Sequence, residues 1–293
     1  MPSSERALTI GLPVYNGAKV VGSAIESLLA QTHADFTLRI SDNASTDDTE
    51  AICRDYAQRH ERIEYVRQPE NLGAMPNFGF LLASATTRYF MWAACDDHWQ
   101  PTFVARNLAA LEASDRGVCS VSRVAFMEGS RVELIGATAP LDGTPAENLV
   151  RYLGAPETNS RFYGIHRTEV LQRCFRADDT YVASDWVVMA RTLRFGTHLE
   201  VPELLMRRGV QGDSSNAVRL VLSTNPSWLS RWWLPMWPMT RRVLAEHGGY
   251  LLREDPAKLR ALVAVLWSEN RRWTRGHRRS LRHRRRAERK RKA

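Results

Sequence analysis

The chain has 293 residues, of which 44% are hydrophobic and 25% are charged. These proportions are ordinary for a globular protein and exclude a mainly disordered, collagen-like or coiled-coil chain. The net charge of +9 is unevenly distributed: residues 271–293 hold 13 Lys and Arg and one acidic residue, so the remainder is slightly acidic. The cysteines form no CxxC pair and indicate free thiols in a reducing compartment; they are Cys53, Cys95, Cys119 and Cys174.

The first 115 residues alternate short apolar runs with amphipathic segments. The apolar runs predict strands at 8–12, 36–40, 63–66 and 89–94, and the amphipathic segments predict helices at 18–30, 45–60, 76–85 and 101–113. We expect Pro13 to end the first strand, and Ser45 to Asp48 form a capping-box signature for the second helix. This alternation favours a parallel sheet covered by helices, whose ligands bind beyond the carboxyl ends of the strands.

Beyond residue 115 the pattern is looser. Apolar runs predict strands at 118–126, 162–166, 198–201 and 204–206, and periodic segments predict helices at 168–174 and 186–195. Residues 136–156 are rich in Gly, Pro, Ala and Thr and predict a mobile loop. A Trp-rich segment begins near Asn225, where Pro235 and Pro238 argue against one long helix. The basic tail predicts a disordered or loosely helical end.

No segment is typical of a transmembrane helix or a signal peptide. A membrane-spanning helix needs roughly 20 consecutive apolar residues, and the longest apolar stretch, Tyr89–Cys95, stops at Asp96. Glu5 and Arg6 precede the first apolar run, which is too short for the core of a signal peptide. We therefore expect a cytoplasmic protein, with peripheral contact at the inner face of the membrane left open.

Polar residues gather at the predicted strand ends. Asp96 and Asp97 follow an apolar strand, where two acids need a cation such as a divalent metal shared with a diphosphate. Alternatively, the pair caps the helix that begins near Pro101. Asp42 can accept a hydrogen bond from a base or ribose, or form an Asx turn. Tyr15 can lie against a base, or be a half-buried aromatic residue.

Five segments occur in order: Leu12 to Asn16, Ser27 to Thr32, Asp42 to Asp47, Asn71 to Gly73, and Cys95 to Pro101. In this order and spacing the chain resembles the family 2 glycosyltransferases of the GT-A fold, densely over residues 7–115 and more thinly over 160–215. The resemblance implies an α/β fold with a Rossmann-like, mostly parallel sheet flanked by helices. It divides the chain into a nucleotide-sugar half (1–115), an acceptor and catalytic half of the same domain (116–215), a Trp-rich helical extension (216–270) and the basic tail (271–293).

The resemblance also implies roles for individual residues. By position, the nucleotide is contacted by Pro13, Tyr15, Asp42 and Asp96, and the divalent metal, Mn²⁺ or Mg²⁺, by Asp97. The family often has an acid where this chain has Cys95, so Asp97 is left as the main protein ligand and weaker metal binding is expected. Cys95 can equally be a small buried hydrophobic residue.

Two later segments complete the implied site. Residues 183–186, Ala-Ser-Asp-Trp, resemble the family segment that supplies the general base, which assigns that role to Asp185; by itself the residue is typical of a helix N-cap. A loop that closes on the diphosphate in related enzymes corresponds here to Arg207, Arg208 and Ser214. Some relatives have a histidine ligand in this loop, but residues 209–211 are Gly, Val and Gln, so no third ligand is expected. Residues 159–164 are a candidate lining of the acceptor pocket.

The implied function is an inverting, metal-dependent transfer of a sugar from a UDP- or dTDP-type nucleotide sugar to a hydroxyl of a glycan or lipid-linked acceptor, in bacterial cell-surface glycan or exopolysaccharide assembly. The competing hypothesis is an inactive relative that binds a membrane surface or nucleic acid through the basic tail. Clustered Lys and Arg attract phosphate of either kind. Nucleic acid is the less expected partner, because Trp273 is the only aromatic residue in the tail.

Overall fold

The computed structural model describes residues 6–128, 131–136, 139–155, 159–209, 221, 227–228, 230 and 234–292. These residues form two compact units. The first comprises Met1–Asp142, Glu157–Asp178 and Arg191–Val210, and the second comprises Gly143–Pro156, Asp179–Ala190 and Gln211–Ala293, in each case over the residues described. The division predicted at residues 115 and 215 is a division by function rather than by contacts within the chain, and it stays a prediction.

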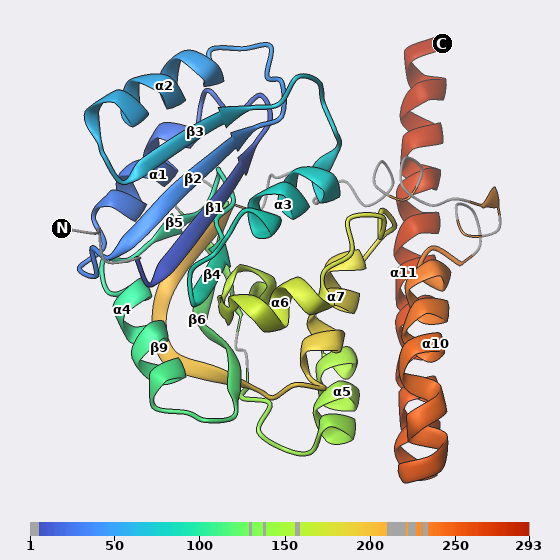
Figure 1. Cartoon of the computed structure of the whole chain (residues 1–293). Helices are drawn as coiled ribbons and strands as arrows, with labels where there is room; N and C mark the ends of the chain where they lie inside the picture. The colour runs from blue at the N-terminus through green and yellow to red at the C-terminus, as the bar shows by residue number, and fades with distance from the viewer. Residues whose placement is uncertain are drawn as a thin grey trace. The chain divides into compact units, whose positions relative to one another are not determined.

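The first unit is built on a sheet of nine described strands (Figure 1). They are β1 (Leu8–Val14), β2 (Phe36–Asp42), β3 (Ile63–Arg67), β4 (Tyr89–Trp92), β5 (His98–Trp99), β6 (Gly117–Glu128), β7 (Arg131–Gly136), β8 (Ile165–Arg167) and β9 (Thr197–Gly209). The order is β3-β2-β1-β4-β8-β6-β9-β5, with β7 paired to β6. Strands β1 to β4 run parallel, whereas β8, β7 and β5 pair antiparallel with their neighbours.

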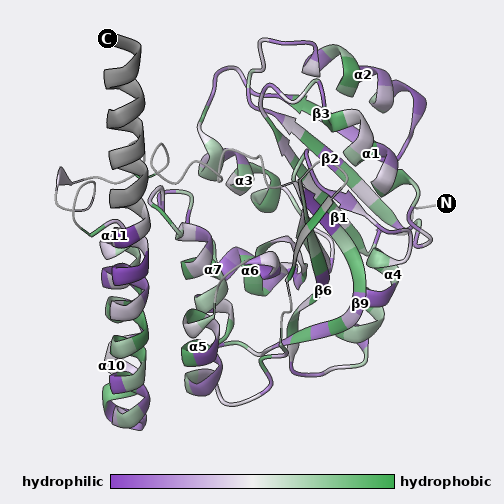
Figure 2. Cartoon of the chain, turned by 180° about the vertical axis from the view of Figure 1, so that it is seen from behind, coloured by the Kyte–Doolittle hydropathy of each residue, from purple (hydrophilic) through white to green (hydrophobic). Residues whose placement is uncertain are grey.

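Helices cover both faces of strands β1 to β3, with α1 and α2 on one face and α3 on the other (Figure 1). The helices of the first unit are α1 (Val21–Leu29), α2 (Thr49–Arg59), α3 (Ala74–Ala83), α4 (Phe103–Glu112), the 3-10 helix η1 (Ser160–Tyr163) and α6 (Thr168–Cys174). Every residue of β1 is buried, and Figure 2 shows the apolar character of the central strands. An apolar run buried on both faces is what a central strand of a helix-covered sheet requires.

The second unit is helical. It contains α5 (Pro145–Gly154), α10 (Trp237–Glu254), α11 (Pro256–Lys292) and the first seven residues of α7 (Ser184–Thr192). Among the described helices, none is long and apolar enough to span a membrane.

The α/β architecture and the N-terminal elements confirm the predictions, with differences at two boundaries. β1 continues through Pro13 to Val14. Pairing with β4 ends at Gly11, so Pro13 lies where β1 has one neighbour, and an open side tolerates proline. The predicted capping box of Ser45 and Asp48 is wrong, because Asp47 accepts the Thr49 amide instead.

Three segments beyond residue 115 also differ from the predictions. The strand predicted at 162–166 begins only at Ile165, because Ser160–Tyr163 form the 3-10 helix η1. The predicted mobile loop at 136–156 contains α5, which begins with a capping box between Thr144 and Glu147 and a proline in its first turn. The two short strands predicted at 198–201 and 204–206 are one strand, β9, whose pairing with β6 shifts register around Pro202. A bulge is a position where a strand accommodates proline.

Candidate functional site

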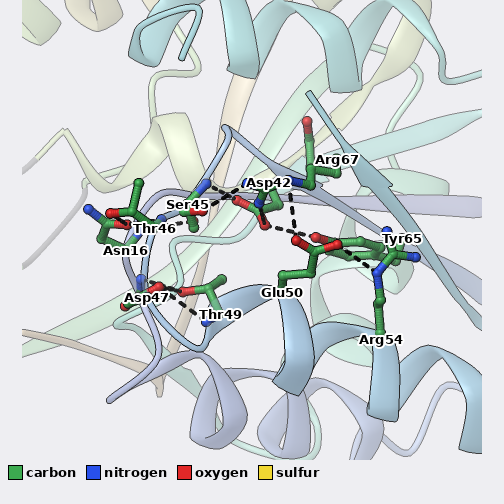
Figure 3. Close-up of polar contacts among 12 residues, drawn as sticks. Asn16, Asp42, Ser45, Thr46, Asp47, Thr49, Glu50, Arg54, Tyr65 and Arg67 are labelled. Atoms are coloured by element: carbon green, nitrogen blue, oxygen red, sulfur yellow. Dashed lines mark hydrogen bonds and ion pairs between the residues drawn. The ribbon is translucent and has the colours of Figure 1, made fainter. Parts of the chain in front are cut away.

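The loops that follow β1 and β2 are hydrogen-bonded to each other (Figure 3). The Asn16 amide donates to Ser45 Oγ at 2.9 Å, and Asn16 Oδ1 accepts from the Thr46 amide at 2.8 Å. Asn16 has a φ of 51°, which asparagine tolerates better than most residues. Two further bonds join the loops, from the Gly17 amide to Thr49 Oγ1 and from the Ala18 amide to Asp47 Oδ2. The loops therefore form one rigid surface at the carboxyl ends of the strands.

Asp42 ends β2 and is completely buried. Its Oδ2 accepts from Tyr65 Oη at 2.8 Å and from Arg67 Nη1 at 2.9 Å, and its Oδ1 accepts the Ser45 amide at 2.8 Å. Burial and the bond to Asp42 raise the pKa of Tyr65. Arg67 also pairs with Glu50 at 3.3 Å, so the four side chains form a connected network (Figure 3). The turn alternative for Asp42 is present, and its contact with a nucleotide stays a prediction.

The loop after β3 is attached to the same surface through Asn43. Its Nδ2 donates to Asn71 Oδ1 at 2.9 Å and to the Gly73 carbonyl at 3.2 Å, and its Oδ1 accepts the Leu72 amide at 2.9 Å. Gly73 has a φ of 83°, a conformation that glycine adopts without strain. The sequence segment at 71–73 thus has a structural purpose, because it fixes the start of α3.

Side chains of α1 and the residues after it hold the segment that carries the acidic pair. Ser27 Oγ accepts the Trp99 amide at 3.3 Å. Gln31 Nε2 donates to the Gln100 carbonyl at 2.9 Å, and Gln31 Oε1 accepts the Val104 amide at 2.9 Å. The segment at 27–32, which the sequence could only mark as part of a family pattern, therefore positions the turn between β4 and α4.

Asp97 is buried, with 4% of its surface exposed, whereas its neighbour Asp96 is exposed. Strand β5 pairs with β9 so that His98 lies opposite Arg207. This pairing brings Arg208 Nε to 3.3 Å from Asp97 Oδ2. Burial raises the pKa of Asp97 to about 7, against the attraction of Arg208. At a buried carboxyl beside a single cation, a charged ligand shifts the balance between the protonated and the ionised form of the carboxyl.

Arg208 is itself held between aromatic rings. Its guanidinium carbon lies 4.4 Å from the ring centre of Tyr163 and 5.6 Å from that of Phe126. Such stacking suits the planar guanidinium. Tyr163 belongs to the segment predicted to line the acceptor pocket, so the structure brings that segment to Asp97 and Arg208. Arg207 is exposed, and Ser214 lies outside the described residues.

The two nucleotide residues predicted at the end of β1 differ in exposure: Pro13 is buried in β1, and Tyr15 is 47% exposed. Cys95, which stands where the family often has an acid, is half-buried. A side chain added at Gly17 would lie 3.4 Å from Cys95 Sγ, which shows how close the two segments come. Tyr15 is thus the accessible aromatic ring at this edge of the sheet.

Carboxylates are the candidate metal ligands at this edge of the sheet. Within the described ranges, no group of three or more His, Cys, Asp and Glu side chains is arranged to hold a metal. Asp97 and the exposed Asp96 offer two carboxylates, a donor set that suits Mg²⁺ or Mn²⁺ when phosphate oxygens complete the shell. The residues fit an ion that arrives with a diphosphate better than an ion bound by protein alone.

Asp185 lies in the first turn of α7, which begins at Ser184, and is half-buried. It is therefore inside the helix rather than at the predicted N-cap position. Ala183, directly before the helix, has a φ of 61°, which is rare for alanine and costs roughly 1 kcal/mol or more. Strain of this kind is concentrated at functional sites. Asp185 belongs to the second unit and Asp97 to the first, and the role of Asp185 stays a prediction.

Solved structures of other proteins share the fold. The chain matches the structure of Staphylococcus aureus TarS 1–349 in complex with UDP at a TM-score of 0.60 and 14% identity, covering 94% of this chain and 91% of that one. It matches the mannosyltransferase PcManGT from Pyrobaculum calidifontis, in complex with GDP-Man and Mn²⁺, at a TM-score of 0.53 and 16% identity, covering 91% and 76%. At these identities the likeness shows the fold alone.

Curated relatives match parts of the chain. A putative teichuronic acid biosynthesis glycosyltransferase, TuaG of Bacillus subtilis, is 27% identical over 158 residues, which are 54% of this chain and 56% of TuaG. An uncharacterized glycosyltransferase of Rickettsia prowazekii is 31% identical over 108 residues, which are 37% of this chain and 33% of that protein. The chain thus spans a third to about half of the length of these relatives. The model of the family described as glycosyl transferase family 2 matches residues 9–169, more than half of the chain, and the chain belongs to this family.

Proposed function

We propose that the chain is an inverting glycosyltransferase that moves a sugar from a UDP- or dTDP-type nucleotide sugar to a hydroxyl of a glycan or lipid-linked acceptor. The observation that carries the proposal is the meeting of Asp96, Asp97 and Arg208 at the edge of the sheet where α/β folds bind ligands. Family membership supports it, as do the complexes of similar folds with UDP and GDP-Man. The name of TuaG supports a place in cell-surface glycan or exopolysaccharide assembly.

On the donor side, Tyr15 lies against the base, and Pro13 and Asp42 shape its pocket. Asp42 is already bonded to Tyr65 and Arg67, so these two residues join it in positioning the base. Neither was assigned a role from the sequence. The network restricts the orientation of the base before the nucleotide arrives, which lowers the entropic cost of binding.

At the diphosphate, Asp96 contacts the ribose, and Asp97 would hold a divalent ion, Mn²⁺ or Mg²⁺. When bound, the ion supplies charge stabilisation for the leaving diphosphate. The Tyr163 and Phe126 rings hold the Arg208 guanidinium in place. Arg208 therefore needs little reorganisation to donate when negative charge develops on the leaving diphosphate. Arg207 and Ser214 stay predicted contacts of the diphosphate, on the family resemblance alone.

On the acceptor side, Asp185 takes the proton of the attacking hydroxyl, which approaches the anomeric carbon opposite the leaving group and so inverts it. Asp185 lies in the first turn of α7, where the helix N-terminus favours the negative charge of a carboxylate that accepts a proton.

Two variants of similar shape test the two sides separately. Asp97→Asn should abolish the Mn²⁺-dependent rise in melting temperature with UDP or dTDP, whereas Asp185→Asn should keep it and lose turnover by roughly 10²–10⁴-fold. Asp48→Asn changes an exposed carboxylate directly before α2 and is the matched control. It should change neither the Mn²⁺-dependent rise in melting temperature nor the turnover. If a panel of nucleotide sugars gives no thermal shift and no transfer with the unaltered chain, the inactive relative replaces this proposal.

A further inference from the structure

Helix α11 is longer than its packing partners. It spans 37 residues from Pro256 to Lys292, its first part packs against α5 and α10, and Leu262 and Leu266 in this part are buried. Asn270 Nδ2 donates to Thr240 Oγ1 at 2.6 Å, close to the beginning of α10. The remaining residues of α11 therefore extend beyond the end of this pairing.

One face of α11 exposes apolar side chains next to cations. Val263 is 46% exposed and Trp267 is 51% exposed. The Arg271 guanidinium lies 5.4 Å from the ring centre of Trp267. These three residues are spaced by four, so they lie above one another on the same face. Figure 2 shows the described part of α11 becoming hydrophilic toward its C-terminal end.

The basic charge continues from this face to the end of the helix. Residues 271–292 contain 13 Lys and Arg and one acidic residue, and α11 carries them as one continuous helix. The preceding 270 residues carry slightly more acidic than basic residues, so the excess of positive charge is confined to this helix. A positive helix with an apolar and aromatic strip is the pattern of helices that lie in a membrane interface.

We propose that α11 binds an anionic lipid surface. Val263 and Trp267 enter the boundary between headgroups and acyl chains, where tryptophan is favoured. Arg271 and the basic residues after it lie along the lipid phosphates, each adding attraction that salt screens. The apolar side chains of Val263 and Trp267 and the basic charge are two separate attractions to the membrane, and stable attachment requires two. Nucleic acid would use the charge alone and leave the strip in water.

The inference is independent of the proposed chemistry and uses the full-length chain. The measurement is co-sedimentation with phosphatidylcholine vesicles, with and without phosphatidylglycerol. We expect binding to the anionic vesicles only, and about tenfold weaker binding after charge reversal with Arg271→Glu and Arg275→Glu. Trp267→Ala should also weaken binding about tenfold, because it removes half-exposed apolar area that the lipid would cover. Trp228→Ala, which changes a tryptophan that is 66% exposed elsewhere, is the matched control and should bind normally.

A second readout places Trp267 in the lipid. Brominated acyl chains should quench the fluorescence of the unaltered chain more than that of Trp267→Phe. Equal quenching, or equal sedimentation of Trp267→Ala and Trp228→Ala, would overturn the proposal. So would tighter binding to a DNA duplex than to anionic vesicles, since that assigns the charge to nucleic acid. A dimer in light scattering that Trp267→Ala dissociates would assign the strip to a second copy of the chain.

Discussion

Two buried aspartates, Asp42 at the end of β2 and Asp97 in the turn between β4 and β5, are held in different ways. Asp42 accepts three hydrogen bonds from groups of its own chain. Asp97 faces the Arg208 guanidinium at 3.3 Å, and burial raises its pKa to about 7 against Arg208 and the Gly209 amide. A buried carboxylate whose charge is balanced by several hydrogen-bond donors strengthens the structure. A buried carboxylate with fewer donors can still be stabilised by the positive charge of a ligand. Asp42 therefore stabilises the loops around the site, whereas Asp97 stays available to a ligand.

The largest expected effect tests the structural side of this comparison. Asp42→Asn removes the charge that pairs with Arg67 and should lower the free energy of unfolding by about 3 kcal/mol, the low end for a broken buried pair. The low end applies because Arg67 keeps 32% of its side chain exposed. Chemical denaturation measures the change, and Asp48→Asn should leave stability unchanged. A change as small as that of the control would mean that the network contributes little to folding.

A pH series extends the comparison to buried histidines. His166 is completely buried, and burial lowers its pKa from 6.5 to about 4; burial also lowers the pKa of His198. Because the unfolded chain binds these protons more readily, the histidine contribution to stability should be complete above pH 6.5 and be lost as pH falls to 4, by roughly 3 kcal/mol for His166. Asp97, whose pKa is raised to about 7, contributes a slope of the opposite sign over this range, so the histidine slope is read from the difference between the unaltered chain and a histidine variant. Unfolding free energies measured across this range test it.

His166→Gln, which has no proton to gain, should flatten part of that slope. An identical slope in the variant would assign the acid sensitivity to other groups.

The next effect concerns the ligand side. Arg208→Gln should lower the transfer rate about 10²-fold, because it removes a fixed donor at the developing charge. The melting temperature should change less than it does in Asp42→Asn. Arg173→Gln is the matched control, since Arg173 is exposed on α6 and pairs with Glu169 rather than with Asp97. Equal losses in both variants would show that the contact with Asp97 is not the cause of the loss.

The smallest expected effect tests strain in the loop that follows Asp42. Ala44 has a φ of 59°, so Ala44→Gly should raise the free energy of unfolding by about 0.5–1 kcal/mol. Ala51→Gly, a change within α2, should instead destabilise by about 1 kcal/mol. A loss of stability in Ala44→Gly would mean that the methyl group makes packing contacts worth more than the strain.

The sequence predicted the strand and helix order of the first 115 residues because buried strands and amphipathic helices leave distinct periodic patterns. It also predicted that Asp42 ends a strand. The partners Tyr65 and Arg67 could not be predicted, because they depend on the register of β2 against β3, which pairs Asp42 with Arg67.

The start of α5 is a different case, since the Thr144 and Glu147 capping box is readable and was outweighed by the Gly and Pro content around it. The left-handed conformations of Ala44 and Ala183 leave no signal at all, because alanine does not favour them.

The bonds through Asn16, Asn43 and Asn71 have a consequence for protein engineering and for evolution. Each amide bonds to a neighbouring loop, so a change in one loop leaves a donor or acceptor of the next without its match. Positions 43 and 71 should consequently covary among relatives. An attempt to transplant donor preference from another enzyme should move the three loops together as a single cassette, because exchanging one alone would disturb the other two.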